Sequence, residues 1–393
     1  MIKNITEKII YIGVDDTDID LFESQYVVPN GVSYNSYLIL DEKVAVMDTV
    51  DRRKSDEWLQ NLDTALAGRK PDYLVIQHLE PDHAGTIAIA MERYPEMQVV
   101  ASDKAVKMMP QFFANTSFEG RTIGVKEGDT LALGAHTLTF LMAPMVHWPE
   151  TMVTWLAEEG TVFSGDAFGT FGVVDDVIDR EGTFERYRDE MMRYYSNIVG
   201  KYGVPVQAAL KKLAGLDLKR ICSTHGPVWE HDIPAVIDLY DRMSRYHGER
   251  GVCIVYGSMY GNTAAAADAL ASELEVRGIP YAIHDLAGNN VDDLGLSGAI
   301  RDAFRYDTVV VGSPTYNNGI FPPVEAFMKA LQARLLKGRR FYAFGSYTWA
   351  AASVRLLNEL AVSMGFELIG DGLAFPQAYT SVKCDMASVA DLI

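Results

Sequence analysis

Side chains that can bind metal ions follow several apolar, β-like runs in the first half of this sequence. The densest group lies in the segment H-L-E-P-D-H, which directly follows the run Tyr73–Gln77. Single His and Asp residues occur downstream in the segments M-V-H-W-P-E, S-G-D-A-F-G and S-T-H-G-P. Any one of them alone would be interpreted as a turn residue or a satisfied buried polar group. Together they are numerous enough to bind two metal ions: His78, Glu80, Asp82, His83, His147, Asp166 and His225.

The donor types of this set favour a redox-active metal over zinc. Zinc prefers nitrogen and sulfur ligands and has no redox chemistry. Three carboxylates against the charges of two divalent ions leave one positive charge, which a bridging hydroxide would neutralise. Such an oxygen-rich site suits iron, and manganese also accepts it. Asp166 can bridge the two ions. The other histidines are expected to be structural or solvated: His136, His231, His247 and His284.

A second group of chemistry-bearing residues follows the apolar run Val252–Tyr256. The segment G-S-M-Y-G-N-T leads into an Ala-rich helix expected to begin near Ala264. A tight turn of small hydroxyl residues at a helix N-terminus offers backbone N–H groups and a positive dipole end to a phosphate. Because the turn has no Lys and lacks the spacing G-x-x-x-x-G-K, it suits a monophosphate better than a triphosphate. On its own, the segment also fits an ordinary strand-to-helix turn.

Two further loops match this one. The segment G-S-P-T-Y-N-N-G follows Val311, and the segment G-S-Y-T-W-A follows Phe344. In an open α/β sheet, the loops beyond the carboxyl ends of the strands converge where the strand order reverses. Trp349 can cover a flat ring there, although it also fits the role of a packing residue at a helix start. The three loops together predict a site for a monophosphate that carries a flat ring.

Two domains, residues 1–248 and residues 251–393, are expected to position these groups, and they differ in their pattern of strands and helices. The first mixes helical stretches such as Phe184–Val199 with short β-rich runs. In the second, five alternating strand and helix units predict a doubly wound parallel sheet. The junction is placed in the polar segment Arg245–Gly251. The expected strands are Tyr73–Gln77, Gln98–Ala101, Thr137–Leu141, Met152–Leu156, Thr161–Ser164, Val252–Tyr256, Tyr281–His284, Thr308–Val311, Arg340–Phe344 and Leu368–Leu373.

The composition excludes several classes of function. With 35 Lys and Arg against 53 Asp and Glu, the net charge is −18, which repels nucleic acids and anionic membrane surfaces. No apolar run approaches the roughly 20 residues of a membrane span, and the first residues lack a signal-peptide pattern, so a cytoplasmic protein is expected. Cys222, Cys253 and Cys384 form no C-x-x-C pair, which argues against a disulfide framework, a zinc ribbon or an attached rubredoxin module.

Residues 251–393 resemble a flavodoxin, in which three loops hold FMN without a covalent bond. By that resemblance the first loop binds the phosphate and the other two hold the isoalloxazine ring. The third loop reads S-Y-T-W-A where relatives usually have Gly in the middle. An altered backbone at Thr348, and with it an altered flavin potential, is therefore expected. The implied FMN-binding residues are Ser258, Met259, Tyr260, Gly261, Asn262, Thr263, Ser313, Pro314, Thr315, Tyr316, Asn317, Asn318, Ser346, Tyr347, Thr348, Trp349 and Ala350.

The first domain resembles the metallo-β-lactamase fold, an αββα sandwich with a dinuclear site at one edge of the sheets. Zinc hydrolases of that fold typically read H-x-H-x-D-H, whereas this chain has Glu80 in place of the second His. The fusion of the two domains is similar to a flavodiiron protein of the shortest type. The resemblance implies one iron on His78, Glu80 and His147, a second on Asp82, His83 and His225, and Asp166 as the bridge.

The resemblance also implies reduction of O₂ to water, of NO to N₂O, or of both. Two ferrous ions and a reduced flavin together hold the four electrons that O₂ requires, and two electrons couple two NO molecules. An external donor is expected, such as a separate rubredoxin, a flavin reductase or a deazaflavin donor. A head-to-tail homodimer or a dimer of dimers is expected, since it brings one subunit's flavin beside the other's irons. Glu23 occupies a stretch where many relatives have a His beside the irons, so it is expected to shift the preference between O₂ and NO.

Two other functions stay open. A zinc or iron hydrolase acting on a thiolester or phosphodiester would use the flavodoxin-like domain as a regulator or tether. Glu80 and the lack of an evident substrate-binding extension count against it. The third function is an electron carrier with a vestigial metal site, which is disfavoured because every candidate ligand is present.

Overall fold

The computed structural model describes residues 1–287, 294–376 and 378–393. The chain forms two compact units. Unit 1 comprises Met1–Phe22, Val28–Tyr195 and Val204–Asp241, and unit 2 comprises Glu23–Val27, Ser196–Gly203 and Arg242–Ile393. Because two short segments of the first half group with unit 2, one boundary cannot describe the division. The bounds 1–248 and 251–393 stay a prediction.

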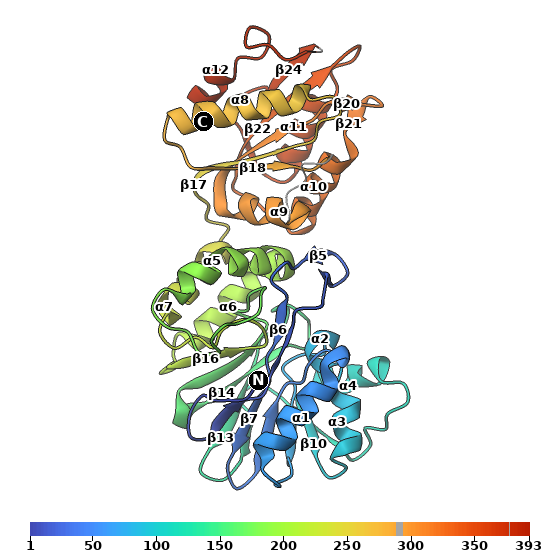
Figure 1. The fold of residues 1–393 in the computed structure, drawn as a ribbon, viewed down its shortest axis with the longest axis vertical. Helices are drawn as coiled ribbons and strands as arrows, with labels where there is room; N and C mark the ends of the chain where they lie inside the picture. The colour runs from blue at the N-terminus through green and yellow to red at the C-terminus, as the bar shows by residue number, and fades with distance from the viewer. Residues whose placement is uncertain (288–293, 377) are drawn as a thin grey trace. The chain divides into compact units, whose positions relative to one another are not determined.

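Unit 1 contains two facing β-sheets with one apolar core between them (Figure 1). Residues of both sheets, such as Ile39, Val100, Phe140 and Phe163, meet in that core. The larger sheet has the order β1-β2-β7-β8-β9-β10-β11 and the smaller one β12-β13-β14-β15-β16. The strands are β1 (Lys3–Asn4), β2 (Ile9–Tyr11), β7 (Tyr37–Leu40), β8 (Val44–Met47), β9 (Tyr73–Val75), β10 (Gln98–Ser102), β11 (Thr122–Val125), β12 (Thr130–Ala132), β13 (Thr137–Met142), β14 (Met152–Leu156), β15 (Thr161–Gly165) and β16 (Arg220–Ser223).

Helices cover the outer faces of these sheets. α1 (Ser55–Leu66) buries Trp58, Leu62 and Leu66, which are spaced four residues apart and so share one face. α4 (Asp103–Phe112) contacts β10 and β11 of the larger sheet. Residues of α6 (Gly203–Leu213) and α7 (Ile233–Ser244) line a cavity together with Val153 of the smaller sheet. The predicted αββα sandwich is confirmed. The other helices are α2 (Pro81–Ala84), α3 (Ile87–Arg93) and α5 (Thr183–Tyr194), which continues into a π-helical turn over Tyr195–Val199.

Unit 2 contains a parallel sheet of the order β18-β17-β19-β22-β23, with β24 also paired to β22. α8 and α12 contact each other and share a core with alternating residues of the central strand, such as Val252 and Ile254. α9 contacts the same sheet and α10, and α10 contacts α11. The predicted doubly wound parallel sheet is confirmed (Figure 1). The elements are β17 (Glu249–Tyr256), α8 (Asn262–Val276), β18 (Tyr281–Asp285), α9 (Gly295–Arg305), β19 (Tyr306–Gly312), α10 (Pro322–Ala333), β22 (Arg340–Tyr347), α11 (Ser353–Ser363), β23 (Glu367–Leu368), β24 (Leu373–Pro376) and α12 (Met386–Leu392).

The prediction of one last strand over Leu368–Leu373 is wrong. β22 pairs first with β23 and then, further along, with β24, so the sheet has six strands instead of five. Gly370 and Gly372 lie between the two segments with φ of 117° and 83°. These values suit glycine and interrupt a strand.

Among the described residues, no helix combines the length and the apolarity that crossing a membrane requires.

Candidate functional site

The predicted metal ligands meet at one edge of the unit 1 sandwich. β13 and β15 are both antiparallel to β14, and β15 is parallel to β16. The carboxyl ends of β13, β15 and β16 therefore lie at the same edge of the smaller sheet. The loop after β9 and helix α2 carry His78, Glu80, Asp82 and His83, and the loops after β13, β15 and β16 carry His147, Asp166 and His225.

One oxygen of Asp166 faces a first set of these side chains. Asp166 Oδ2 lies 3.3 Å from His78 Nε2 and 3.0 Å from His147 Nε2. Glu80 belongs to the same set, because its Oε2 lies 2.7 Å from His147 Nε2 and 3.5 Å from His78 Nε2. Two imidazoles and two carboxylate oxygens thus surround one point.

The other oxygen of Asp166 faces the remaining side chains. Asp166 Oδ1 lies 3.4 Å from His83 Nε2 and 3.6 Å from His225 Nε2. Asp82 completes this second set, with Oδ2 at 3.0 Å from His225 Nε2 and Oδ1 at 3.8 Å from His83 Nε2. The structure therefore brings all the predicted ligands together around the two oxygens of Asp166. His83 lies between the two sets, because its Nε2 is also 3.1 Å from His78 Nε2 and groups with His78, Glu80 and Asp166.

Asp82 tests whether this cluster suits cations. Both of its carboxylate oxygens are buried, and neither has a hydrogen-bond partner among the described residues. His225 Nε2 is likewise without one, although it lies 3.0 Å from Asp82 Oδ2. Burial raises the pKa of Asp82 to about 6. A buried carboxylate without partners is costly, and a metal ion between these atoms would satisfy them, so the residues fit a metal centre.

The imidazoles of the cluster are strongly coupled. The Nε2 atoms of His78 and His83 are 3.1 Å apart, so both rings cannot be protonated together. Burial opposes protonation of His78, but the Asp166 charge outweighs it and raises the pKa of His78. Burial, and then His78, lower the pKa of His83. Burial also opposes protonation of His147, yet hydrogen bonds to Asp166 and Glu80 raise its pKa to about 9. Metal ions would displace such protons, because they bind neutral imidazole.

Groups outside the cluster orient its members. His225 Nδ1 donates to the backbone C=O of Ser33 at 2.7 Å, which leaves Nε2 facing the cluster. The N–H of Leu79 donates to Glu150 Oε1 at 3.1 Å, which holds the loop between β9 and α2. Glu150 ends the segment M-V-H-W-P-E, but nothing in the sequence marks it or Ser33 as a positioning residue.

Tyr194 is a candidate residue that the sequence did not reveal. Its hydroxyl is buried without a hydrogen-bond partner among the described residues, and its ring lies 5.6 Å from that of His225. Burial, and then the charges of Asp166, Asp82 and Glu80, raise the pKa of Tyr194 well above its usual value. The hydroxyl therefore keeps its proton beside the cluster. A tyrosine in an amphipathic helix looks like a core residue, so no sequence signal distinguishes it.

Glu23 directly follows β4 (Leu21–Phe22). Its backbone has a φ of 49°, and its carboxylate accepts a hydrogen bond from Gln25 Nε2 at 2.9 Å. The neighbouring Phe22 ring lies 5.7 Å from the ring of His225. The role of Glu23 stays a prediction.

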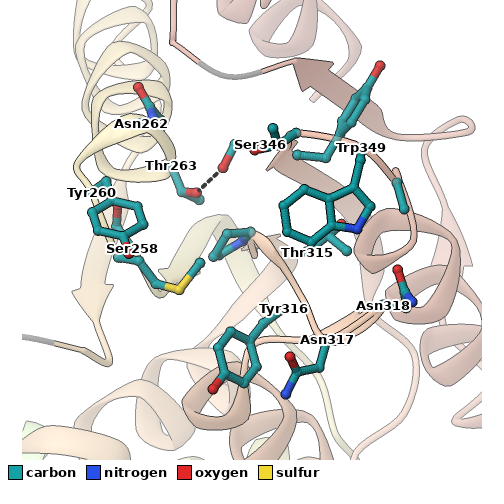
Figure 2. Close-up of a pocket in the computed structure, with 15 residues that line it drawn as sticks. Ser258, Tyr260, Asn262, Thr263, Thr315, Tyr316, Asn317, Asn318, Ser346 and Trp349 are labelled. Carbon is teal, nitrogen blue, oxygen red and sulfur yellow. Dashed lines mark hydrogen bonds between the residues drawn. The ribbon is translucent and has the colours of Figure 1, made fainter.

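Unit 2 contains a cavity of about 350 Å³ that the three predicted loops line (Figure 2). Of the predicted FMN-binding residues, Gly261 and Ser313 do not line it. Gly261 precedes α8 with a φ of 84°. Ser313 is buried, and its Oγ accepts a hydrogen bond from the backbone N–H of Phe321 at 3.0 Å. The lining residues are Ser258, Met259, Tyr260, Asn262, Thr263, Pro314, Thr315, Tyr316, Asn317, Asn318, Ser346, Tyr347, Thr348, Trp349 and Ala350.

The cavity has a polar end and an aromatic side. At the start of α8 the Thr263 hydroxyl lies 3.1 Å from that of Ser346, and Trp349 lies on the opposite side of the cavity (Figure 2). Trp349 is 85% exposed and Tyr260 is 88% exposed. Such exposure disfavours the interpretation of Trp349 as a packing residue. Thr348 is not among the residues with positive φ, so its backbone accepts a side chain without strain.

Two family models match this chain. The model described as ODP family beta lactamase matches residues 32–226, and the flavodoxin model matches residues 254–389. The anaerobic nitric oxide reductase flavorubredoxin of Vibrio vulnificus is 30% identical over 377 residues, which cover 93% of this chain and 74% of the relative. The nitric oxide reductase of Moorella thermoacetica is 31% identical over 370 residues, which cover 93% of this chain and 91% of the relative.

Solved structures resemble the whole chain as well. The rubredoxin oxygen:oxidoreductase of Desulfovibrio gigas has a TM-score of 0.92 at 28% identity, covering 100% of this chain and 98% of that one. The flavodiiron protein from Giardia intestinalis also has a TM-score of 0.92, at 26% identity, covering 100% of this chain and 96% of that one. The sandwich with its His and carboxylate cluster and the sheet with its three-loop cavity occur here in one chain, which is an oxidoreductase of the flavodiiron protein family.

Proposed function

We propose that this protein reduces NO to N₂O, O₂ to water, or both, at two iron ions in unit 1, with electrons that arrive through FMN in unit 2. The division of the cluster between the two oxygens of Asp166 is the observation that supports this function. Bound iron would supply the gas-binding site and two electrons, and reduced FMN would supply two more. O₂ consumes four electrons and four protons to give two water molecules. Two NO consume two electrons and two protons to give N₂O and water.

We assign the first iron to His78, Glu80 and His147 and the second to Asp82, His83 and His225, with Asp166 as the bridge. The distances within each set support this assignment. The carboxylates neutralise most of the charge that two divalent ions bring into a buried site. Glu80 supplies oxygen where a zinc hydrolase of similar fold would supply nitrogen, which favours iron.

Tyr194 is our candidate for a proton donor or hydrogen-bond donor to the bound gas. Its protonated hydroxyl has no other partner among the described residues, and its pKa responds to the charges of Asp166, Asp82 and Glu80. Tyr194→Phe should retain iron and lower kcat by about 100-fold, the lower end of typical general-acid effects. Tyr187→Phe on the same helix is the control, because the Tyr187 hydroxyl donates to the C=O of Val173. Equal turnover in the two variants would remove Tyr194 from this role.

FMN is assigned to the cavity of unit 2. The N-terminus of α8, with Ser258 and Thr263, would bind the phosphate. Trp349 in the third loop presents an exposed ring at the cavity for the isoalloxazine, and Tyr260 lies in the first loop beside Ser258 at the phosphate end (Figure 2). Asn317 and Asn318 in the second loop adopt the left-handed backbone conformation, with φ of 47° and 57°. Apart from Gly, mainly Asn and Asp adopt this conformation.

Electrons require an external donor, which we propose to be a separate rubredoxin or a flavin reductase. The relatives named flavorubredoxin or rubredoxin oxygen:oxidoreductase support a rubredoxin. We further propose a head-to-tail homodimer or a dimer of dimers in the cytoplasm, without nucleic acid or membrane partners. Light scattering of the active holoenzyme tests the assembly, and an active monomer would refute it.

The preference between the two gases is assigned in part to Glu23. Glu23→His should change the ratio of NO to O₂ turnover, because it replaces an anionic side chain with one that can donate a proton at neutral pH. Asp20→His places the same imidazole at an exposed position three residues away and serves as the control. An unchanged ratio in Glu23→His would remove Glu23 from this role.

One experiment tests the whole proposal. The purified protein is reduced anaerobically, its iron, zinc and FMN are counted, and flavin reoxidation is followed after O₂ or NO is added. Rapid reoxidation with about two iron ions per chain is expected. Zinc with an unreactive flavin would indicate the hydrolase instead, and FMN without metal would indicate the electron carrier.

A further inference from the structure

A small apolar cavity lies on the outer side of the smaller sheet of unit 1. Its volume is about 20 Å³, above the roughly 10–15 Å³ that a cavity needs to hold one water-sized molecule. Strand ends, the loops beside two proposed ligands, and helices α6 and α7 contribute its walls. The lining residues are Met142, Ala143, Val146, Val153, Ala167, Phe168, Val206, Ala209, Leu210, Lys212, Leu213 and Tyr240.

The inner wall of this cavity adjoins the proposed metal centre. Val146 immediately precedes His147, and Ala167 immediately follows Asp166. Because consecutive Cα atoms are about 3.8 Å apart, these walls lie within one residue of two ligands in the first set. Val146 and Ala167 are buried, so the cavity reaches from the helix layer to the back of the ligand loops.

The lining of this cavity suits an uncharged molecule. They consist mainly of Val, Leu, Ala, Met and Phe side chains. The one charged lining side chain, Lys212, is exposed, and its Nζ donates to Glu127 Oε2 and to the C=O of Met142, each at 2.7 Å. An apolar cavity of this kind excludes ions, stays dry and takes up small apolar molecules such as xenon.

We propose that this cavity is a docking site for the diatomic gas substrate next to the metal centre. O₂ and NO are uncharged, form only weak hydrogen bonds with water and match the size of the cavity. Ala209 and Leu210 of α6 are only partly buried, whereas Val146 and Phe168 are buried. The cavity therefore opens toward the surface at α6 and closes at the ligand loops. The identity of the gas rests on the proposed function.

Xenon tests the cavity directly. Crystals of the holoenzyme under xenon pressure should show a xenon site among Val146, Phe168 and Leu210. Ala209→Phe places a ring in the cavity and should abolish that site. Ala208→Phe adds the same ring at the adjacent exposed position, which does not line the cavity, and should keep the site. Leu210→Trp provides a second filling variant.

Kinetics test the role of the cavity. The second-order rate constant for oxidation of the reduced holoenzyme by O₂ or NO should fall about tenfold in Ala209→Phe relative to Ala208→Phe, with iron and FMN contents unchanged. No xenon site in the parent protein, or equal rate constants in the two variants, would overturn the proposal. If the loaded parent protein reacts with neither gas, the proposed function fails, and the xenon result still decides whether the cavity takes up an apolar gas.

Discussion

The metal cluster of unit 1 and the cavity of unit 2 bind their proposed cofactors in opposite ways. The rings of His78, His83 and His225 are fully buried, whereas Trp349 and Tyr260 are largely exposed. The cluster concentrates buried carboxylates and imidazoles, whose protons metal ions would displace. The cavity offers hydroxyls, amides and rings on surface loops. The proposed iron site thus lies in the protein interior, and the proposed FMN site lies at the surface.

The largest effect is expected at Asp166, on which both sets of ligands depend. Asp166→Asn removes a charge that faces four imidazoles and should lower iron affinity by more than about 100-fold, since even outer partners of ligands contribute 10–100-fold. Flavin reoxidation by O₂ or NO should fall below detection, while FMN content stays unchanged. Elemental analysis and flavin spectra measure both. His231→Ala, an exposed imidazole outside the cluster, is the control. If Asp166→Asn bound as much iron as the parent protein, the two sets of ligands would not depend on Asp166.

The carboxylate of Asp302 provides a contrast, because it is buried in unit 2 beside the Arg301 guanidinium and the His284 imidazole. Asp302 Oδ2 lies 2.9 Å from His284 Nε2 and 2.7 Å from Arg301 Nη2. Breaking such a buried pair typically costs about 3–5 kcal/mol, so Asp302→Asn should lower the free energy of unfolding of unit 2 by that amount. Denaturant unfolding followed by flavin release measures it, with the exposed Asp371→Asn as the control.

The Asp302 carboxylate should also make the stability of the folded state depend on pH. Burial opposes ionisation of Asp302, but His284 and Arg301 outweigh it and lower its pKa. A lowered pKa stabilises the folded state above the usual carboxyl range, and this stability is lost as pH falls through the lowered value. The parent protein should therefore lose more stability below about pH 4 than Asp302→Asn does. Denaturant unfolding at a series of pH values measures this difference. If stability fell equally with pH in the two proteins, the lowered pKa of Asp302 would be contradicted.

A smaller effect is expected at Thr263, in the polar end of the cavity. Thr263→Val keeps the shape but removes the hydroxyl, and a hydrogen bond to a charged group contributes about 1.5–3 kcal/mol. The Kd for FMN should rise about 10–150-fold, as measured by titration of the apoprotein, with little change in iron content. Ser272→Ala, on the exposed side of the same helix, is the control. An unchanged Kd would place the phosphate elsewhere.

The smallest effect is expected at Trp349. An aromatic contact contributes about 0.5–1.5 kcal/mol beyond its buried area, so Trp349→Ala should weaken FMN binding about 2–12-fold. Trp349→Phe should restore most of the affinity. Quenching of flavin fluorescence measures binding in both variants. If Trp349→Ala bound FMN as tightly as the parent, the exposed ring would have no part in holding the cofactor.

Residue types at strand ends were sufficient to predict which side chains gather at the edge of the unit 1 sandwich and which loops line most of the cavity. His78 and Asp166 belong to compact motifs, and loop residues such as Thr263 follow recognisable strands, so local sequence carries both signals. Which oxygen of Asp166 each imidazole faces could not be derived from spacing, because it depends on how four loops pack. Tyr194 was missed for the same reason.

The fold shows a similar limit. Alternating strand and helix runs predicted the parallel sheet, since each strand of a buried sheet is a continuous apolar segment. The division of the last strand escaped prediction, because the effect of Gly370 and Gly372 depends on their neighbours in the sheet. The grouping of Glu23–Val27 and Ser196–Gly203 with unit 2 rests on contacts distant in sequence.

The spread of the cluster along the chain has a consequence for biosynthesis. The proposed ligand His78, in the loop after β9, is synthesised early, but His225 is synthesised only after β16. A nascent chain on the ribosome would therefore lack an imidazole of the second set until most of unit 1 had emerged. Under the proposed assignment, insertion of both irons is a late event in maturation, and a chain terminated before His225 would be unable to complete the pair.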